Sequence, residues 1–215
     1  MKLEGIAKIS EKVKQLFEQE GSGHDWWHIY RVQKLAIKIA KVEQANIELV
    51  NYIALLHDIA DHKLTNKPEK ALHKANEWLI EAGLSSKKIE LVLDSIANLS
   101  FKGAKVPDVA LSLEATIVQD ADRLDAIGAI GIARAFAYGG SKARLIYLPD
   151  EKPQMHASTE AYRKSKSSTI NHFYEKLLHL QERMVTATAK DMAFQRHQFM
   201  IDFLDRFYNE WNGKS

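Results

Sequence analysis

The chain has 215 residues, no cysteine and a net charge of +2. The near balance of charge excludes a strongly basic surface for a nucleic-acid polymer, and the lack of cysteine excludes disulfides and thiolate metal sites. Hydrophobic residues make up 46% of the chain, enough for a sizeable core, yet no apolar run approaches the ~20 residues of a membrane span. The N-terminal residues lack the apolar region of a signal peptide, so we expect a cytoplasmic protein with no membrane partner.

Apolar spacing predicts helices along most of the chain and no strands. In the first half the expected helices, with Asp25 and Gly83 as caps of the second and fourth, are Ile6–Glu20, Asp25–Val42, Ile47–Asp61, Lys70–Ala82 and Ser85–Leu99. After a polar loop from Phe101 to Pro107, the pattern resumes at Ser112 and continues to about Tyr138, and two more helical patterns follow Ile170. We therefore expect an all-α fold, an orthogonal multi-helix bundle forming one domain over residues 1–215.

One long segment lacks this regularity. Between Gly139 and Ser168, two glycines and two prolines lie among Lys, Ser, Thr and Glu with weak periodicity. We expect a loop-rich, partly ordered insert with a short helix around Thr159 to Lys164. Its role is left open between a lid over the substrate, entered through a flexible Gly139-Gly140, and an ordinary exposed loop.

The stretch from Ile53 to Asp61 carries His57, Asp58 and Asp61 directly behind four apolar residues. On a helix, these three side chains have spacings of three and four residues and can point into one space. Burying an imidazole and two carboxylates is costly, and a divalent metal removes that cost because neutral His and ionised Asp are its natural ligands. The alternative is a His that only hydrogen-bonds a backbone carbonyl, beside an N-capping Asp.

Two other predicted helices carry the same kinds of residue beside their apolar stripes: His28 on one, and Asp120 or Asp122 on the other. A helical bundle can bring such residues together in its core. Two His and two Asp suit one divalent ion with open water positions, Mn²⁺ or Mg²⁺ first, with Fe²⁺, Co²⁺ or Ni²⁺ as alternatives. Asp120 and Asp122 lie about 200° apart around a helix, so both cannot easily bind the same ion.

This order of residues resembles the HD-domain metal-dependent phosphohydrolases. The matching segments are His28-Ile29-Tyr30-Arg31-Val32, Leu55-Leu56-His57-Asp58-Ile59 and Ala121-Asp122-Arg123-Leu124. A longer likeness is to the small stand-alone bacterial members of the YedJ and YpgQ type, and it covers nearly the whole chain. It rests on His24-Asp25-Trp26-Trp27-His28, on Gln119 to Gly131 and on His172 to Leu178.

The resemblance implies an HD-type helical fold and an enzyme whose metal ligands are His28, His57, Asp58 and Asp122. His28 is preferred over His24, which precedes the helix, and Asp120 becomes a residue that contacts a ligand or caps the backbone. Asp61 matches an acidic position that would orient the attacking water or accept its proton. The alternative for Asp61 is a surface carboxylate at a helix end.

The implied reaction is hydrolysis of nucleoside triphosphates, or their deoxy forms, to monophosphate and pyrophosphate. A nucleoside monophosphatase and a cyclic-nucleotide phosphodiesterase are the enzymatic alternatives, and a metal-containing nucleotide sensor without turnover is the rival from another class. Candidate substrate contacts are Trp27 for a base and Arg31, His62, Lys63 and Arg123 for phosphate, each with a packing or solvated role as its alternative. The expected partner is thus a small nucleotide or phosphate ester; a homodimer is compatible with the sequence but not indicated by it.

Overall fold

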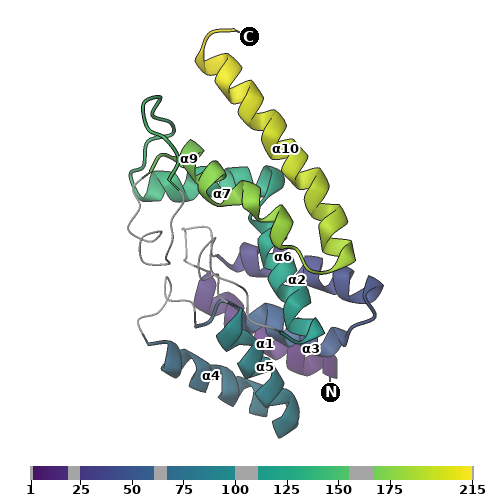
Figure 1. Cartoon of the computed structure of the whole chain (residues 1–215). Coiled ribbons are helices and arrows are strands. Elements are labelled where there is room, and N and C mark those ends of the chain that lie inside the picture. Colours follow the sequence, from purple (N-terminus) through teal and green to yellow (C-terminus); the bar gives the residue numbers. More distant parts are fainter. Residues whose placement is uncertain (1, 19–24, 61–66, 100–110, 155–166, 215) are drawn as a thin grey trace. The chain divides into compact units, whose positions relative to one another are not determined.

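The computed structural model describes residues 2–18, 25–60, 67–99, 111–154 and 167–214, and every regular element in these ranges is a helix (Figure 1). The all-α prediction is therefore confirmed. No helix in this part of the chain is long and apolar enough to cross a bilayer. Two compact units can be distinguished, with their border inside helix α6, between Ala121 and Asp122. The single-domain organisation stays a prediction.

The first unit is built around one helix that is buried on all sides. Its elements are α1 (Lys2–Phe17), α2 (Trp26–Val42), α3 (Ile47–Leu56), α4 (Pro68–Glu81), α5 (Ser86–Asn98) and most of α6 (Leu113–Asp125). All residues of α3 from Leu49 to Leu56 are buried, because the helix packs against α1, α2 and α5. The one amide side chain in that run, Asn51, donates to the Ile47 carbonyl at 2.8 Å and accepts from Gln33 Nε2 at 3.0 Å, so both ends of the buried amide are hydrogen-bonded.

The start of α2 follows its predicted cap, whereas the end of α3 differs from the prediction. Asp25 is the N-cap of α2, as predicted, and its Oδ1 accepts from the His28 amide at 2.9 Å. The third helix was predicted to reach Asp61, but α3 ends at Leu56 and residues 57–60 form a turn. The Ile59 amide bonds to the Leu56 carbonyl three residues back, at 3.0 Å, so the four-residue ladder of an α-helix is not continued.

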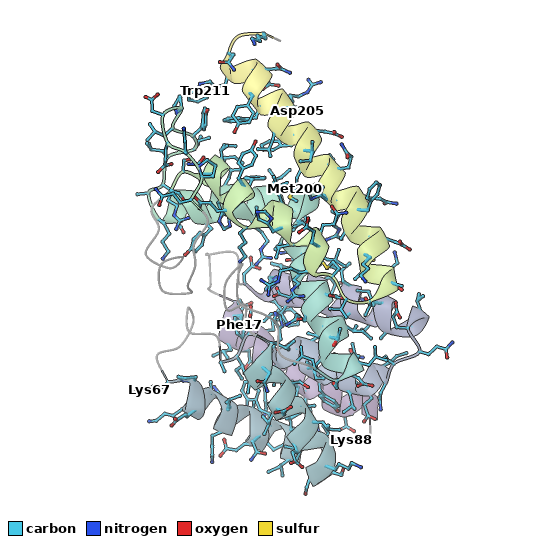
Figure 2. All side chains as sticks on the ribbon, viewed as in Figure 1. Phe17, Lys67, Lys88, Met200, Asp205 and Trp211 are labelled. Carbon is cyan, nitrogen blue, oxygen red and sulfur yellow. The ribbon has the colours of Figure 1, made fainter. Side chains whose placement is uncertain are left out.

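The second unit consists of the last turn of α6, α7 (Gly128–Ser141), α9 (Thr169–Glu175), two short 3₁₀ helices η1 (Leu177–His179) and η2 (Gln181–Arg183), and α10 (Ala187–Trp211). Helix α7 packs against α9 and α10. Aromatic rings fill part of this contact: Phe173 stacks on Phe203 with centroids 5.8 Å apart, and Phe136 lies 6.1 Å and 6.0 Å from them. Trp211 lies near the C-terminal end of α10 (Figure 2), with its ring centroid 5.1 Å from that of Tyr147.

The helix predicted from Ser112 to Tyr138 is two helices, because the chain turns at Ala126 and Ile127 between α6 and α7. Gly128 has a φ of +74°, a left-handed conformation that ends regular helix geometry and that glycine adopts without strain. The apolar pattern runs unbroken across this turn, since Ile127 is buried in the turn as it would be in a helix. Periodicity alone therefore could not reveal the break.

The segment expected to be a loop-rich insert begins as a helix. Gly139 and Gly140 belong to α7, so the prediction that they form a flexible entry is wrong. Residues 142–154 contain no regular element, and the short helix expected at Thr159 to Lys164 lies outside the described residues. The buried Glu175 carboxylate ties the described ends together, because Oε1 accepts from the Gln154 amide at 3.0 Å and Oε2 from the Ser167 hydroxyl at 2.7 Å. The lid role stays a prediction.

The contact between α7 and α9 gives a direct test of this arrangement. A Cβ on Gly139 would lie 2.2 Å from Thr169 Oγ1, whereas a Cβ on Gly140 would meet nothing within 4 Å. We expect Gly139→Ala to lower the free energy of unfolding by about 1–3 kcal/mol, as overpacking does. Gly140→Ala should leave it unchanged or raise it by up to about 1 kcal/mol, since alanine favours helix. Urea unfolding measures both.

Adding Thr169→Ala to the Gly139→Ala variant removes the colliding hydroxyl and should restore part of the lost stability. If Gly139→Ala and Gly140→Ala had the same effect, the close approach of the two helices at Gly139 would be incorrect.

Candidate metal centre

His28, His57 and Asp58 form a buried cluster in the first unit, with exposed fractions of 0%, 8% and 7%. The Nε2 atoms of the two imidazoles are 3.3 Å apart. The Asp58 carboxylate places Oδ2 3.3 Å from His28 Nε2 and Oδ1 3.5 Å from His57 Nε2. Among the described residues, this is the group of His, Asp and Glu side chains whose ligand atoms come close enough together to hold a metal ion.

Two adjacent helices supply the cluster. His28 lies in the first turn of α2, whose start is fixed by the Asp25 cap three residues earlier. His57 directly follows the last residue of α3 and keeps right-handed helical angles, with φ −56° and ψ −34°, and Asp58 comes next in the turn. Since α2 and α3 pack against each other, the two rings meet edge to face with centroids 5.3 Å apart.

A backbone hydrogen bond sets the tautomer of His57. Its Nδ1 lies 2.8 Å from the Ala54 carbonyl oxygen. Because a carbonyl only accepts, Nδ1 carries the hydrogen, and the neutral ring presents an unprotonated Nε2 to the cluster. The alternative that the sequence left open, a His bound to a backbone carbonyl, is thus present, and it supports the metal-ligand interpretation, since ligating imidazoles usually donate their other nitrogen in this way.

The spacing and chemistry of the three side chains fit a divalent ion. Two ligand atoms each about 2.1 Å from an ion are about 3.0 Å apart at right angles and about 3.4 Å apart in a tetrahedron. The observed separations of 3.3 Å, 3.3 Å and 3.5 Å lie close to these values. A metal ion bound here would also offset the lost hydration of a carboxylate buried against two ring nitrogens.

The two late acidic residues lie on either side of the border between the units. Asp120 is completely buried and belongs to the first unit, whereas Asp122 is half-buried and belongs to the second. Two residues apart on α6, they face different directions, as the sequence suggested. Asp122 as the fourth ligand, and Asp120 as a residue that supports the ligands, both stay predictions.

The other predicted site residues differ in what surrounds them. Asp61, His62 and Lys63 lie outside the described residues. Trp27 is 59% exposed next to His28 on α2 and meets the Tyr30 ring edge to face at 5.8 Å, so it is not a core residue. The half-buried Arg31 lies one turn further along α2.

Arg123 is buried, and its Nη1 donates to the Arg183 carbonyl, which gives this guanidinium a structural contact within the second unit. Two arginines that the sequence analysis did not single out, Arg134 and Arg196, also bind the end of α6. Their partners are 9 and 72 residues away in the chain, so no local motif could have indicated them.

The HD-domain family model matches residues 26–127, which contain all three residues of the cluster. The Bacillus subtilis protein YpgQ is 37% identical over 203 residues, which cover 94% of this chain and 91% of YpgQ. This chain belongs to the HD-domain family. Two crystal structures are similar to the HD-domain protein described here. An HD-superfamily hydrolase from Bacillus thuringiensis has a TM-score of 0.79 at 43% identity over 99% of both chains. B. subtilis YpgQ in complex with ADP has a TM-score of 0.79 at 33% identity over 97% and 96% of the chains.

Membership identifies the protein as an HD-superfamily hydrolase, within a group of metal-dependent phosphohydrolases. The predicted family and the predicted enzyme class are both confirmed. HD domains bind divalent metals, and His28, His57 and Asp58 form a group that could hold one in this member.

We expect the purified HD-domain protein to contain about one divalent ion, and His57→Ala or Asp58→Ala to lose it, because each removes a donor from a three-residue buried cluster. Elemental analysis after gel filtration measures the ion. His73→Ala is the matched control, since His73 lies on α4 with an exposed side chain. Circular dichroism verifies that each variant is folded.

Asp122→Ala should also lose the ion, whereas Asp120→Ala should keep it and show weaker activity. A full metal content in Asp58→Ala would contradict the cluster as the metal site, and loss of the ion in Asp120→Ala alone would move the fourth ligand by two residues.

Proposed function

We propose that this hydrolase cleaves nucleoside triphosphates, including their deoxy forms, between the α and β phosphorus atoms. Water adds to the α phosphorus, and the products are a nucleoside monophosphate and pyrophosphate. The buried cluster of His28, His57 and Asp58 carries the proposal, since its nitrogen and oxygen donors fit a divalent ion. The nucleotide part is supported by the similar B. subtilis protein YpgQ, one of whose crystal structures is a complex with ADP.

In this proposal, a bound divalent ion, Mn²⁺ or Mg²⁺ first, supplies Lewis-acid polarisation of a phosphoryl oxygen and lowers the pKa of water toward neutrality. The chain's own part is to hold that ion in a fixed place. His57 is held by Ala54 in the tautomer that binds metal, and Asp58 adds the negative charge. Asp122 is proposed as the fourth ligand, and Asp61 as the residue that orients the water or accepts its proton.

The proposed substrate contacts begin on the helix that carries His28. Trp27 and Arg31 are four residues apart on α2 and so lie on one face of it. The Trp27 ring is exposed, and Trp27 directly precedes the proposed metal ligand His28 in the chain. An exposed indole offers a face on which any base can stack, and a guanidinium suits phosphate oxygens. We assign the base to Trp27 and a phosphate to Arg31, with His62, Lys63 and Arg123 as further proposed phosphate contacts.

A turnover assay tests the reaction. The protein, stripped of metal and supplied in turn with Mn²⁺, Mg²⁺, Fe²⁺, Co²⁺ or Ni²⁺, is given a panel of nucleoside triphosphates, monophosphates and cyclic nucleotides. We expect monophosphate and pyrophosphate in equal amounts from a triphosphate, detected by ion-exchange chromatography, and no turnover by Asp58→Asn. That substitution keeps the shape of the side chain but removes its charge.

Each alternative gives a different product pattern in the same assay. Inorganic phosphate from a monophosphate indicates a monophosphatase, and opening of a cyclic nucleotide indicates a phosphodiesterase. Nucleotide binding by calorimetry without any product indicates a sensor. Any of these three results would contradict the proposed pyrophosphohydrolase.

The role of Trp27 is tested separately from the metal. Trp27→Ala should raise KM for the best triphosphate by about 5- to 150-fold, because base stacking on an aromatic ring contributes about 1–3 kcal/mol. Its metal content should equal that of the wild type. Trp211→Ala is the control, since Trp211 is 51% exposed on α10 and has no proposed role in the site. Equal KM values for wild type and Trp27→Ala would remove Trp27 from the substrate site.

A further inference from the structure

The last turn of α6, which carries Asp122, is closed by three backbone contacts. Helix ends leave carbonyls without partners inside the helix. The Ala126 amide lies 3.2 Å from the Asp122 carbonyl and 3.1 Å from that of Arg123, and the Ile127 amide lies 3.2 Å from that of Leu124. These distances lie within the normal range for N–H···O bonds, and the Leu124 carbonyl has a second lone pair that can accept a further donor.

Arg196 supplies such a donor from the middle of α10. Its Nη1 donates to the Leu124 carbonyl, two residues after Asp122. Ala193 and Met200, about one turn away on either side, are completely buried, so Arg196 lies at the face of α10 that packs inward. A cation is also favoured at the C-terminal end of a helix, where the carbonyl dipoles point.

Partial burial removes water from the charged guanidinium of Arg196, and the nearby Asp125 carboxylate offsets part of that desolvation cost. Burial lowers the pKa of Arg196, and the attraction of Asp125 opposes that change. Asp125 is itself only 1% exposed, and its Oδ2 accepts from Arg134 Nη1 of α7 at 2.9 Å. The end of α6 is therefore bound from two helices, by guanidinium groups whose planar shape fixes direction as well as distance.

The turn after α6 is shaped to let the Arg196 side chain pass. A Cβ on Gly128 would lie 3.0 Å from both Cβ and Cγ of Arg196. Gly128 also has a φ of +74°, where other residues are strained. Gly128 therefore allows the backbone turn and also leaves room for the aliphatic part of the Arg196 side chain. Both features let Arg196 reach the end of α6.

We propose that Arg196 is a positioning residue for Asp122: by holding the Leu124 carbonyl, it sets the place of the helical turn that carries Asp122, the proposed fourth metal ligand. This inference rests on the proposed function to the extent that Asp122 is the fourth ligand. Arg196 does not touch the ion or the substrate. Loss of Arg196 should therefore lower the affinity for the metal ion, because a carboxylate on a displaced turn binds the ion less well.

Isothermal titration with Mn²⁺ tests this on the metal-stripped full chain. Arg196→Met keeps a long stem over Gly128 but removes the guanidinium, and we expect its Mn²⁺ affinity to fall by about 10- to 100-fold, the usual effect of losing a residue that orients a ligand. Arg196→Lys keeps the positive charge but lacks the planar guanidinium, and its Mn²⁺ affinity should lie between those of the wild type and Arg196→Met. At saturating Mn²⁺, kcat of Arg196→Met should return to the wild-type value with an unchanged nucleotide KM, since all ligands remain.

Arg206→Met is the matched control, because Arg206 is an exposed arginine on the same helix. It should bind Mn²⁺ like the wild type. A purely structural role for Arg196 predicts a lower melting temperature with unchanged Mn²⁺ affinity, and that result would overturn the proposal. If Arg196→Met does not fold, Arg196→Lys decides in the same way, since unchanged affinity in that variant also overturns it.

The series also separates this proposal from the proposed function. If the wild type binds Mn²⁺ but hydrolyses no nucleotide, the pyrophosphohydrolase is wrong, while the Mn²⁺ affinities still test Arg196. If Asp122→Ala binds Mn²⁺ as tightly as the wild type, Asp122 is not a ligand, and the proposal for Arg196 is overturned with it.

Discussion

A carboxylate buried against two imidazole nitrogens is the interaction on which the candidate site depends. Asp58 lies within 3.5 Å of His28 Nε2 and His57 Nε2 in the core of the first unit. Such a group is costly to keep out of water unless a cation joins it. The surrounding elements make this arrangement available: α3 is buried and packs against α1, α2 and α5, and the Asp25 cap fixes where α2 begins. The apolar core thus acts as a rigid frame for a polar centre.

Much of this could be predicted from the sequence, because the decisive signals are local. The cap at Asp25 and the ligand-type pair after Leu55-Leu56 depend on residues within one or two turns. The cluster of His28, His57 and Asp58 needed one further assumption, that two adjacent apolar helices pack side by side, and the structure agrees. The end of α3 at Leu56 could not be predicted, since a turn and a helix place His57 and Asp58 almost equally well after the apolar run.

The features that the sequence did not reveal depend on contacts between distant residues. The break before Gly128 is hidden because Ile127 is apolar and buried in a turn, as it would be in a helix. The sequence suggests that Gly139 is a flexible residue, whereas the structure shows that it allows the close approach of Thr169 on α9. Arg196 has an ordinary amphipathic setting in α10, and only the fold shows that it binds the end of α6. In each case the role of the residue depends on its surroundings in the fold, which the spacing of residues in the sequence does not reveal.

The hydrogen bond from His57 to Ala54 joins the metal centre to the end of a helix. The Ala54 carbonyl belongs to the last turn of α3, where carbonyls lack partners within the helix, so the ring that offers Nε2 to an ion also caps the helix through Nδ1. By thermodynamic linkage, fraying of this turn and loss of the ion must then promote each other. In the metal-bound form that we propose, a chelator would therefore destabilise the end of α3, and amide hydrogen exchange there would report how fully the site is occupied.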